Sequence, residues 1–221
     1  MSLAPSFLIL KFPAATGAET IERVGQSIAA ARGLVLAGAT AATVKPLETG
    51  SAHNALILAR FAFADDLEAW WTANGASLDR GLDCGLEPGL VALAADGLPW
   101  EGWPGNFVPT IATVDVPDDA ADRCYMLIEG TGHDDERLDR YRDIILPMLR
   151  ERGGYYVLFS LGGSTRVLAG AWDEAVLAIS RWPSRARAED FWTCERYQIE
   201  AIPIRTGVSR FDVQIVDGIA G

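Results

Sequence analysis

Two stretches of the sequence follow the same pattern of residues, and this repetition decides the fold. The first stretch is "ARFAFADDLEAWW", residues 59–71, and the second is "SRWPSRARAEDFW", residues 180–192. In both stretches an Arg follows an apolar run, an aromatic residue follows the Arg, and a Glu stands three residues before a Trp. The two closing residues, Trp71 and Trp192, lie 121 positions apart. An internal repeat with a long period is therefore the first hypothesis to test.

The same offset of 121 relates other positions of the chain. It pairs Gly33 with Gly154 and the Asp-Gly sequence at Asp96 with the Asp-Gly sequence at Asp217, and no gap is needed from Gly33 to Gly97. Only the start of each copy needs a shift of a few residues. The sequence therefore predicts two copies of one unit, residues 1–97 and 122–221, joined by a linker at residues 98–121.

Each copy predicts the order strand–helix–strand–strand–helix–strand. In the first copy, four apolar runs predict strands at residues 6–12, 34–38, 54–61 and 89–95. In the second copy, four such runs lie at residues 124–130, 155–161, 175–182 and 211–216. Between these runs, apolar residues recur at helical spacing, beginning at Ile21, Leu67, Leu138 and Ala188.

Several residues predict where helices and turns lie. Gly33 suits the left-handed residue that ends the first helix. Asp134 or Asp135 caps the first helix of the second copy, and Ser184 caps its second helix. The run "LGGST", which begins at Leu161, predicts a hairpin turn because it lies between two strand patterns.

The predicted order gives an antiparallel sheet with both helices on one face, the ferredoxin-like arrangement. The strands are apolar almost throughout, so both faces of each sheet must be buried. The helices cover one face, and the sheet of the other copy covers the second. The predicted fold is α+β, with two ferredoxin-like repeats whose antiparallel sheets pack as an α+β barrel within one chain.

Composition limits the classes of function. The chain has 221 residues and a formal net charge of −11, and it lacks the basic surface that nucleic acids and anionic membranes require. Three cysteines without a CxxC pair predict neither a disulfide framework nor a zinc site, and no metal site is expected. The apolar run near the N-terminus is too short for a signal peptide, so we expect a cytoplasmic protein.

The second copy resembles the family called domain of unknown function 1330, in the dimeric α+β barrel superfamily. The residues that carry this resemblance are "RERGG" and "YYVLFSLGG" at 150–163, "LAGAW" at 168–172, and "RWPSRARAEDFWTCERYQIEAIPIR" at 181–205. Members of the family usually pair as homodimers. The resemblance therefore implies a monomer built as a pseudo-dimer, or a homodimer of such chains.

The chain departs from the family pattern at several positions. The family often has an acidic residue in the "LAGAW" motif, where this chain has Ala169. It also favours Glu where the two copies have Arg60 and Arg181. In the first copy, Ala76 and Cys84 stand where the second copy has the Tyr and Arg listed below as site candidates. We therefore expect one working site, in the second copy.

The candidate site residues are aromatic and basic. His133 lies on a loop at the predicted mouth of the second copy. Its alternative roles are a general base, a haem ligand or a solvated loop residue. Arg60 and Arg181 end apolar strands, either to anchor an anionic ligand or to pair with the nearby Glu68 and Glu189. The remaining candidates either line a ligand pocket or pack in the core: Tyr156, Trp182, Trp192, Tyr197 and Arg205.

These residues favour a protein that binds a small apolar or aromatic ligand. The resemblance implies oxygenase- or isomerase-like chemistry without a cofactor, in which Arg181 anchors an anionic group, Tyr197 donates a hydrogen bond and His133 is the base. One alternative is haem binding, which the resemblance to the superfamily implies. Another is a non-catalytic scaffold. Trp100, Trp103 and Phe107 predict that the linker packs as a strap or covers a pocket as a lid.

Overall fold

The computed structural model describes residues 4–48, 55–80, 89–98, 116, 120–161 and 164–219. The predicted strap or lid at Trp100, Trp103 and Phe107 lies outside these residues. The first repeat contains five strands and two helices in this order: β1 (Ser6–Phe12), α1 (Ala18–Ala30), β2 (Leu34–Ala39), β3 (Lys45–Glu48), β4 (Ala55–Phe61), α2 (Ala64–Arg80) and β5 (Val91–Asp96).

The second repeat has the same order, with extra helical turns before its last strand. Its elements are β6 (Cys124–Gly132), α3 (Asp135–Glu151), β7 (Tyr155–Leu161), β8 (Arg166–Ala169), β9 (Val176–Trp182), α4 (Arg185–Thr193), a short π-helix (Tyr197–Ala201), α5 (Ile202–Arg205) and β10 (Ser209–Asp217). Among the described residues, no helix is long and apolar enough to cross a membrane.

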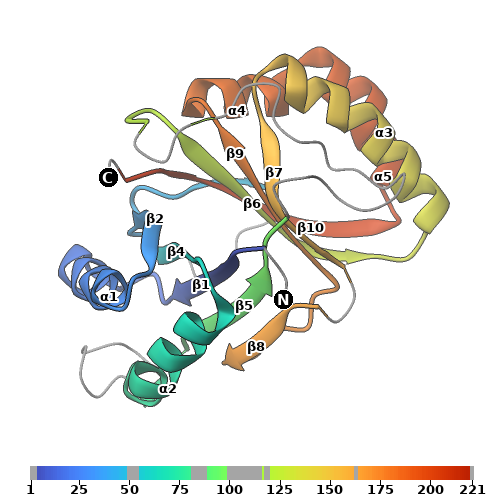
Figure 1. Ribbon diagram of the computed structural model, residues 1–221. Coiled ribbons are helices and arrows are strands. Elements are labelled where there is room, and N and C mark those ends of the chain that lie inside the picture. The colour runs from blue at the N-terminus through green and yellow to red at the C-terminus, as the bar shows by residue number, and fades with distance from the viewer. Residues whose placement is uncertain are drawn as a thin grey trace.

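The strands form two antiparallel five-stranded sheets that pack face to face. The first sheet has the order β2-β4-β1-β5-β8 and the second has the order β7-β9-β6-β10-β3. Helices α1 and α2 lie outside the first sheet, and α3, α4 and α5 lie outside the second, at the opposite end of the molecule (Figure 1). The predicted α+β fold of two ferredoxin-like repeats packed as a barrel is confirmed.

Each repeat gives one short strand to the sheet of the other. Strand β3 of the first repeat pairs with β10, and β8 of the second repeat pairs with β5. The two exchanges correspond, because Glu48 lies opposite Val213 and Ala169 lies opposite Ala92, each pair related by the offset of 121. The two strands predicted on either side of "LGGST", β7 and β9, do pair antiparallel. Their connection is not a hairpin turn, however, because β8 lies between them in the sequence and belongs to the other sheet.

Two further backbone contacts close the barrel. The amide of Leu98, just after β5, donates to the carbonyl of Val157 in β7 at 2.9 Å. The amide of Ile219, just after β10, donates to the carbonyl of Leu36 in β2, also at 2.9 Å. The two donors, Leu98 and Ile219, are again 121 positions apart, and so are the two acceptors, Leu36 and Val157. The end of β5 is therefore linked to β7, and the end of β10 to β2, so each sheet is hydrogen-bonded to the other. The edges of β2 and β7 are partly covered in this way.

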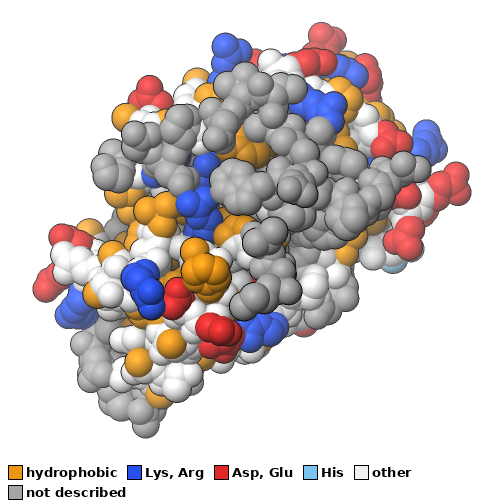
Figure 2. All heavy atoms as spheres, in the orientation of Figure 1, with side chains coloured by type: hydrophobic (Ala, Val, Ile, Leu, Met, Phe, Trp, Pro, Cys, Tyr) orange, Lys and Arg blue, Asp and Glu red, His pale blue; other side chains and the backbone are white. Residues whose placement is uncertain are grey.

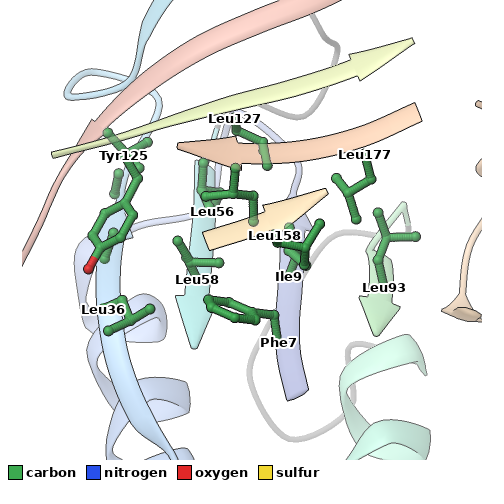
Figure 3. Close-up of a cluster of buried hydrophobic side chains, with 14 of the residues drawn as sticks. Phe7, Ile9, Leu36, Leu56, Leu58, Leu93, Tyr125, Leu127, Leu158 and Leu177 are labelled. Carbon is green, nitrogen blue, oxygen red and sulfur yellow. The ribbon is translucent and has the colours of Figure 1, made fainter. Parts of the chain in front are cut away.

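The space between the sheets is filled by large apolar side chains from both repeats, most of them aliphatic. Figure 3 shows them pointing toward one another: Phe7, Ile9, Leu36, Leu56, Leu58, Leu93, Tyr125, Leu127, Leu158 and Leu177. Full burial of one such side chain contributes roughly 1.5–3 kcal/mol. This shared core explains why the strands lack an alternating pattern, because their second face packs against the helices.

The helix ends agree with the sequence in part. Asp134 caps α3 by accepting from the amide of Arg137, and Ser184 caps α4 in the same way through Arg187. At the end of α1, however, the left-handed residue is Arg32, with φ 64°, and not the predicted Gly33. Gly33 is required for space instead, because a Cβ there would collide with Ile28 and Phe61.

A buried ion pair lies inside the barrel near one end. The ammonium of Lys11 in β1 contacts the carboxylate of Glu129 in β6 at 2.7 Å, and Trp172 donates its indole hydrogen to the same carboxylate at 2.8 Å. Lys11 and Glu129 occupy corresponding positions of the two repeats, since they lie opposite Leu56 and Leu177 in the neighbouring strands. Outside the barrel, acidic and basic side chains are interspersed on the face seen in Figure 2.

Candidate functional site

The candidate site is an apolar cavity between α3 and the outer face of the second sheet. Its volume is about 90 Å³. The wall is formed by Ile128, Leu138, Tyr141, Arg142, Ile145, Leu146, Tyr156, Phe159, Leu161, Val176, Ala178 and Phe211. Because Leu161 is 46% exposed, this side of the cavity lies at the protein surface.

A second, much smaller cavity of about 10 Å³ adjoins the first. The two share five wall residues: Ile128, Tyr141, Ile145, Tyr156 and Phe211. The wall of the small cavity also includes the polar side chains of Ser180, Tyr197 and Arg205. A volume of roughly 10–15 Å³ holds one water-sized group. The site therefore combines an apolar space with a polar recess for a single atom.

Two tyrosines and an arginine form the polar recess. The hydroxyls of Tyr141 and Tyr197 are hydrogen-bonded to each other at 2.9 Å. The guanidinium of Arg205 lies over the rings of Tyr141, Trp192 and Phe211, with its central carbon 5.3–5.9 Å from the ring centroids. Aromatic rings attract a cation over their faces. These rings thus hold the arginine beside the two hydroxyls.

Arg205 is neutralised by a carboxylate from the other repeat. One terminal nitrogen donates to Oε1 of Glu48 at 2.8 Å, and the second contacts Oε2, so the pair is bidentate. The Arg205 side chain is 5% exposed and that of Glu48 is 30% exposed. Burial lowers the pKa of Arg205, but the hydrogen bonds that Arg205 donates to Glu48 outweigh this effect and raise the pKa, so the guanidinium stays charged.

Burial keeps the tyrosines of the site protonated. It raises the pKa of Tyr141 and Tyr197, although the positive charge of Arg205 opposes this shift at both. Burial also raises the pKa of Tyr156, on the opposite wall. All three phenols therefore keep their hydrogens at neutral pH. The recess offers neutral hydroxyl donors and not a phenolate.

The helical turns after α4 bring Tyr197 and Arg205 to the recess. Helix α4 ends at Thr193, and the chain continues through the π-helix into α5, which ends at Arg205. The irregular turns place Tyr197 against Phe191 and Trp192, with ring centroids 4.8 Å and 5.0 Å apart. Single π-turns in helices are frequent at functional sites. The first repeat has one regular helix at the corresponding place, α2.

The parts of the polar recess differ between the two copies. Glu48, which pairs with Arg205, lies on the exchanged strand β3 of the first repeat. The corresponding position on β8 is Ala169, next to the first repeat's own sheet. The counterparts of Tyr197 and Arg205 are Ala76 and Cys84. Strand β8 joins the first repeat, which has Cys84 in place of an arginine. The strand accordingly has Ala169 in place of the acid that would pair with that arginine.

The structure brings together five of the predicted site residues. They line the small cavity, and Tyr156 also lines the large one: Tyr156, Trp182, Trp192, Tyr197 and Arg205. Trp182 is fully buried, and its indole hydrogen is donated to the hydroxyl of Ser180 at 2.9 Å. Arg60 lies at the end of β4, in the other repeat.

Arg181 and His133 lie away from this group. Neighbouring residues of a strand point to opposite faces, so Arg181 faces the barrel interior while Trp182 faces the helices. There Arg181 donates to the carbonyl of Val116 at 2.9 Å and lies over the ring of Tyr125. His133 is exposed in the turn before α3 and lines neither cavity.

Glu68 and Glu189, the acids named above for the strand-end arginines, each form an ion pair with a cation of an exchanged strand. Glu68 pairs with Arg166, and Glu189 pairs with Lys45 at 2.7 Å. Both cations lie on the exchanged strands, which pass close to the second helix of the opposite repeat. The two pairs correspond by the offset of 121. The exchange thus supplies each of these glutamates with a cation from the opposite repeat.

Two residues of the recess were not among the predicted site residues. Tyr141 follows Leu138 at helical spacing on the predicted helix, but the partner of its hydroxyl could not be read from the sequence. Glu48 belongs to a four-residue strand that the sequence did not predict. A signal for Glu48 did exist, since the offset of 121 aligns it with Ala169, where the resembled family often has an acid.

Solved structures with the same arrangement of strands and helices share little sequence with this chain. A candidate monooxygenase from Fusobacterium nucleatum subsp. nucleatum ATCC 25586 superposes with a TM-score of 0.51 and 7% identity, covering 100% of this chain and 97% of the other. A candidate monooxygenase from Lactobacillus acidophilus NCFM has a TM-score of 0.50 and 11% identity, covering 97% and 94%. An anthrone oxidase-like protein has a TM-score of 0.49 and 14% identity, covering 97% and 92%. The first two similarities establish the fold alone.

A comparison with curated proteins finds no match. A family model does match the second repeat, over residues 123–219, and its description is "Domain of unknown function (DUF1330)". The matched residues contain the cavity walls on α3 and the second sheet, together with Tyr141, Tyr197 and Arg205. Residues 123–219 thus match the DUF1330 family model, and they form the second half of an α+β barrel contained in one chain.

Proposed function

We propose that the protein binds a small, mostly apolar molecule in the cavity of the second repeat. The observation that carries this proposal is an apolar space of about 90 Å³ that adjoins a buried polar recess. Ligand sites usually combine an apolar wall with a few polar groups that fix orientation. A cavity of roughly 150 Å³ can hold benzene. A molecule with one ring is therefore the upper size, and it requires small side-chain movements.

Oxygenase- or isomerase-like conversion of such a ligand is a finer form of the same proposal. Two proteins of similar fold are described as candidate monooxygenases, and their low identity means that only the fold is shared. Within this chain, protonated tyrosines beside a charged arginine are suited to stabilising negative charge that develops on a ligand oxygen. Support for catalysis would be turnover of a bound ligand that is lost when the recess is altered.

Haem is not supported as the ligand by these residues. His133, the residue proposed as an axial ligand, is exposed and lines neither cavity. A non-catalytic scaffold would have no need for a buried arginine held beside two hydroxyls in only one of two repeats. The asymmetry of the repeats therefore favours a ligand site over a purely structural role.

Binding can be tested by filling the cavity. The side chain of Ala178 lies in the cavity wall and is 2% exposed, so Ala178→Leu places three additional carbon atoms in this space. Ala171→Leu makes the same change at an exposed position and is the matched control. A panel of monocyclic aromatic and alicyclic compounds is screened by thermal shift. We expect compounds that stabilise the native protein and Ala171→Leu but have no effect on Ala178→Leu. Equal stabilisation of all three proteins would contradict the proposal.

A further inference from the structure

The polar recess contains more hydrogen-bond donors than acceptors. In the Tyr141–Tyr197 pair, one hydroxyl donates to the other, so one phenolic hydrogen is left over. Arg205 uses its two terminal nitrogens to bind Glu48. Its Nε is buried and has no hydrogen-bond partner among the described residues. Two hydrogens therefore lack an acceptor at the same recess.

Buried donors without an acceptor are costly, because each loses its hydrogen bonds to water. Arg205 is 4% exposed and Tyr197 is 1% exposed, and both line the small cavity. The volume of this cavity, about 10 Å³, suits one oxygen atom. The recess is therefore built to receive an acceptor, and its position beside the large cavity connects that acceptor with the body of a ligand.

The charge of the recess decides the kind of acceptor. A ligand carboxylate would be expected to pair with a free guanidinium, but Glu48 already neutralises Arg205 through two contacts. Glu48 would also repel a second carboxylate nearby. A neutral oxygen can accept the two hydrogens without this repulsion. An alcohol fits less well, since its own hydrogen would need an acceptor in a recess that is rich in donors.

We infer that the ligand is a neutral carbonyl compound, whose oxygen enters the recess and accepts hydrogens from Arg205 Nε and from the Tyr141–Tyr197 pair. This inference rests on the proposed function and names the class of ligand for that site. The ring or chain of the ligand occupies the apolar cavity beside Ile128, Ile145 and Tyr156. Hydrogen bonds to the oxygen would strengthen if negative charge developed there.

A pair of probes that differ only in the acceptor tests the inference. Acetophenone and α-methylstyrene have nearly the same shape, but the second has a methylene group in place of the carbonyl oxygen. Benzoate serves as the anionic probe. Binding is followed through methyl resonances of the isotope-labelled protein, where Ile128 and Ile145 report on the cavity and Ile9 and Ile57 report on the other repeat and the barrel.

We expect acetophenone to bind about tenfold more tightly than α-methylstyrene and benzoate, in keeping with one or two net hydrogen bonds. The double variant Tyr141→Phe/Tyr197→Phe should lose this preference, whereas Tyr155→Phe, in the same repeat but not in the cavity wall, should keep it. A double variant is needed because either hydroxyl alone could turn its hydrogen toward the ligand. The carbonyl stretching frequency of bound acetophenone should be lower in the native protein than in the double variant.

The outcomes separate the two proposals. Equal affinity for the ketone and the alkene, with shifts at Ile128 and Ile145, would overturn the carbonyl inference and leave the cavity as a ligand site. Tighter binding of benzoate would overturn it as well, in favour of an anion. If no probe shifts these two resonances, the proposed binding function fails and the inference fails with it.

Discussion

Single side chains in the recess are held by partners that are distant in sequence. Arg205 depends on Glu48, 157 positions away, and on three aromatic rings that surround the guanidinium. A buried charge that loses its partner is much more destabilising than a surface charge that does so. The energetic importance of Glu48 should therefore exceed that of other charged residues on the same strand.

The variants Glu48→Ala and Lys45→Ala compare two ion pairs of strand β3. Removal of Glu48 leaves Arg205 buried without its carboxylate, and we expect the free energy of unfolding to fall by about 3 kcal/mol. Lys45 and its partner Glu189 are 45% and 32% exposed, so Lys45→Ala should cost less than about 1 kcal/mol. Urea unfolding followed by tryptophan fluorescence gives both values. Similar costs for the two variants would mean that Arg205 does not depend on Glu48.

Asp212, beside the buried Lys11–Glu129 pair, should make stability depend on pH. Its pKa is raised to about 6, mainly by burial; Lys11 and Arg210 oppose the shift, and Glu129 and Glu174 add to it. Because the unfolded chain has the lower pKa, the folded protein binds more protons between about pH 4 and 6. The contribution of this group to stability is therefore lost as pH rises through that window.

The variant Asp212→Asn, which keeps the shape of the protonated acid, should remove this dependence. We expect it to melt at a higher temperature than the native protein at pH 8 and at nearly the same temperature at pH 4. Thermal unfolding across this range, with Asp173→Asn as a control at an exposed acid nearby, checks the prediction. A constant difference between the variant and the native protein at all pH values would argue against it.

At the scale of elements, the sequence predicted the long strands and helices but not the short exchanged ones. Seven-residue strands that are mostly apolar, such as β4, give a strong signal, and the repeat revealed their order. Strands β3 and β8 have only four residues, mostly exposed or partly exposed, so local pattern says little about them. Their partners are set by the other repeat, and a prediction made within one repeat could not identify them.

The candidate site was predictable to a similar degree. Its aromatic residues follow a repeated motif and a family resemblance, and these identified Tyr156, Trp182, Trp192, Tyr197 and Arg205. Contacts across the exchange could not be found in this way. Arg181 and Trp182 were both assigned to the pocket, although neighbouring residues of a strand point to opposite faces. With Trp182 in the pocket, this alternation would have placed Arg181 in the barrel interior.

Glycine variants test how β8 is held against β5. Gly170, next to β8, has φ 76°, and a Cβ there would collide with the backbone of Leu90 and Val91. Gly207 has a similar φ of 80°, but nothing lies near the place of its Cβ. Gly207→Ala should therefore cost about 1 kcal/mol from backbone strain alone, and Gly170→Ala clearly more. Chemical unfolding of both variants measures the difference, and equal costs would show that β8 can move away freely.

At the scale of the whole molecule, the two repeats share one core and complete each other's sheets. The side chains between the sheets come from both repeats, and each sheet has a strand from the other (Figures 1 and 3). Neither repeat could unfold without exposing the inner face of its partner. The chain should therefore behave as a single cooperative unit, although it contains two copies of a fold.

Cooperative unfolding can be measured with one probe in each repeat. The methyl resonances of Ile57 and Ile145 report on the helix-covered cores of the first and second repeat. Both should disappear at the same urea concentration, together with the change in tryptophan fluorescence. Midpoints that differ between the two methyl groups would show that the repeats unfold separately.

The Lys11–Glu129 pair has a consequence for the ancestry of the molecule. A homodimer of identical subunits would carry the same residue at both positions, so this contact could arise only after the two halves had become separate sequences, free to change independently. If either half now paired with a copy of itself, two ammonium groups or two carboxylates would meet in the barrel, where like charges repel strongly. The charge pair therefore makes the fusion difficult to reverse, because each half has become selective for the other.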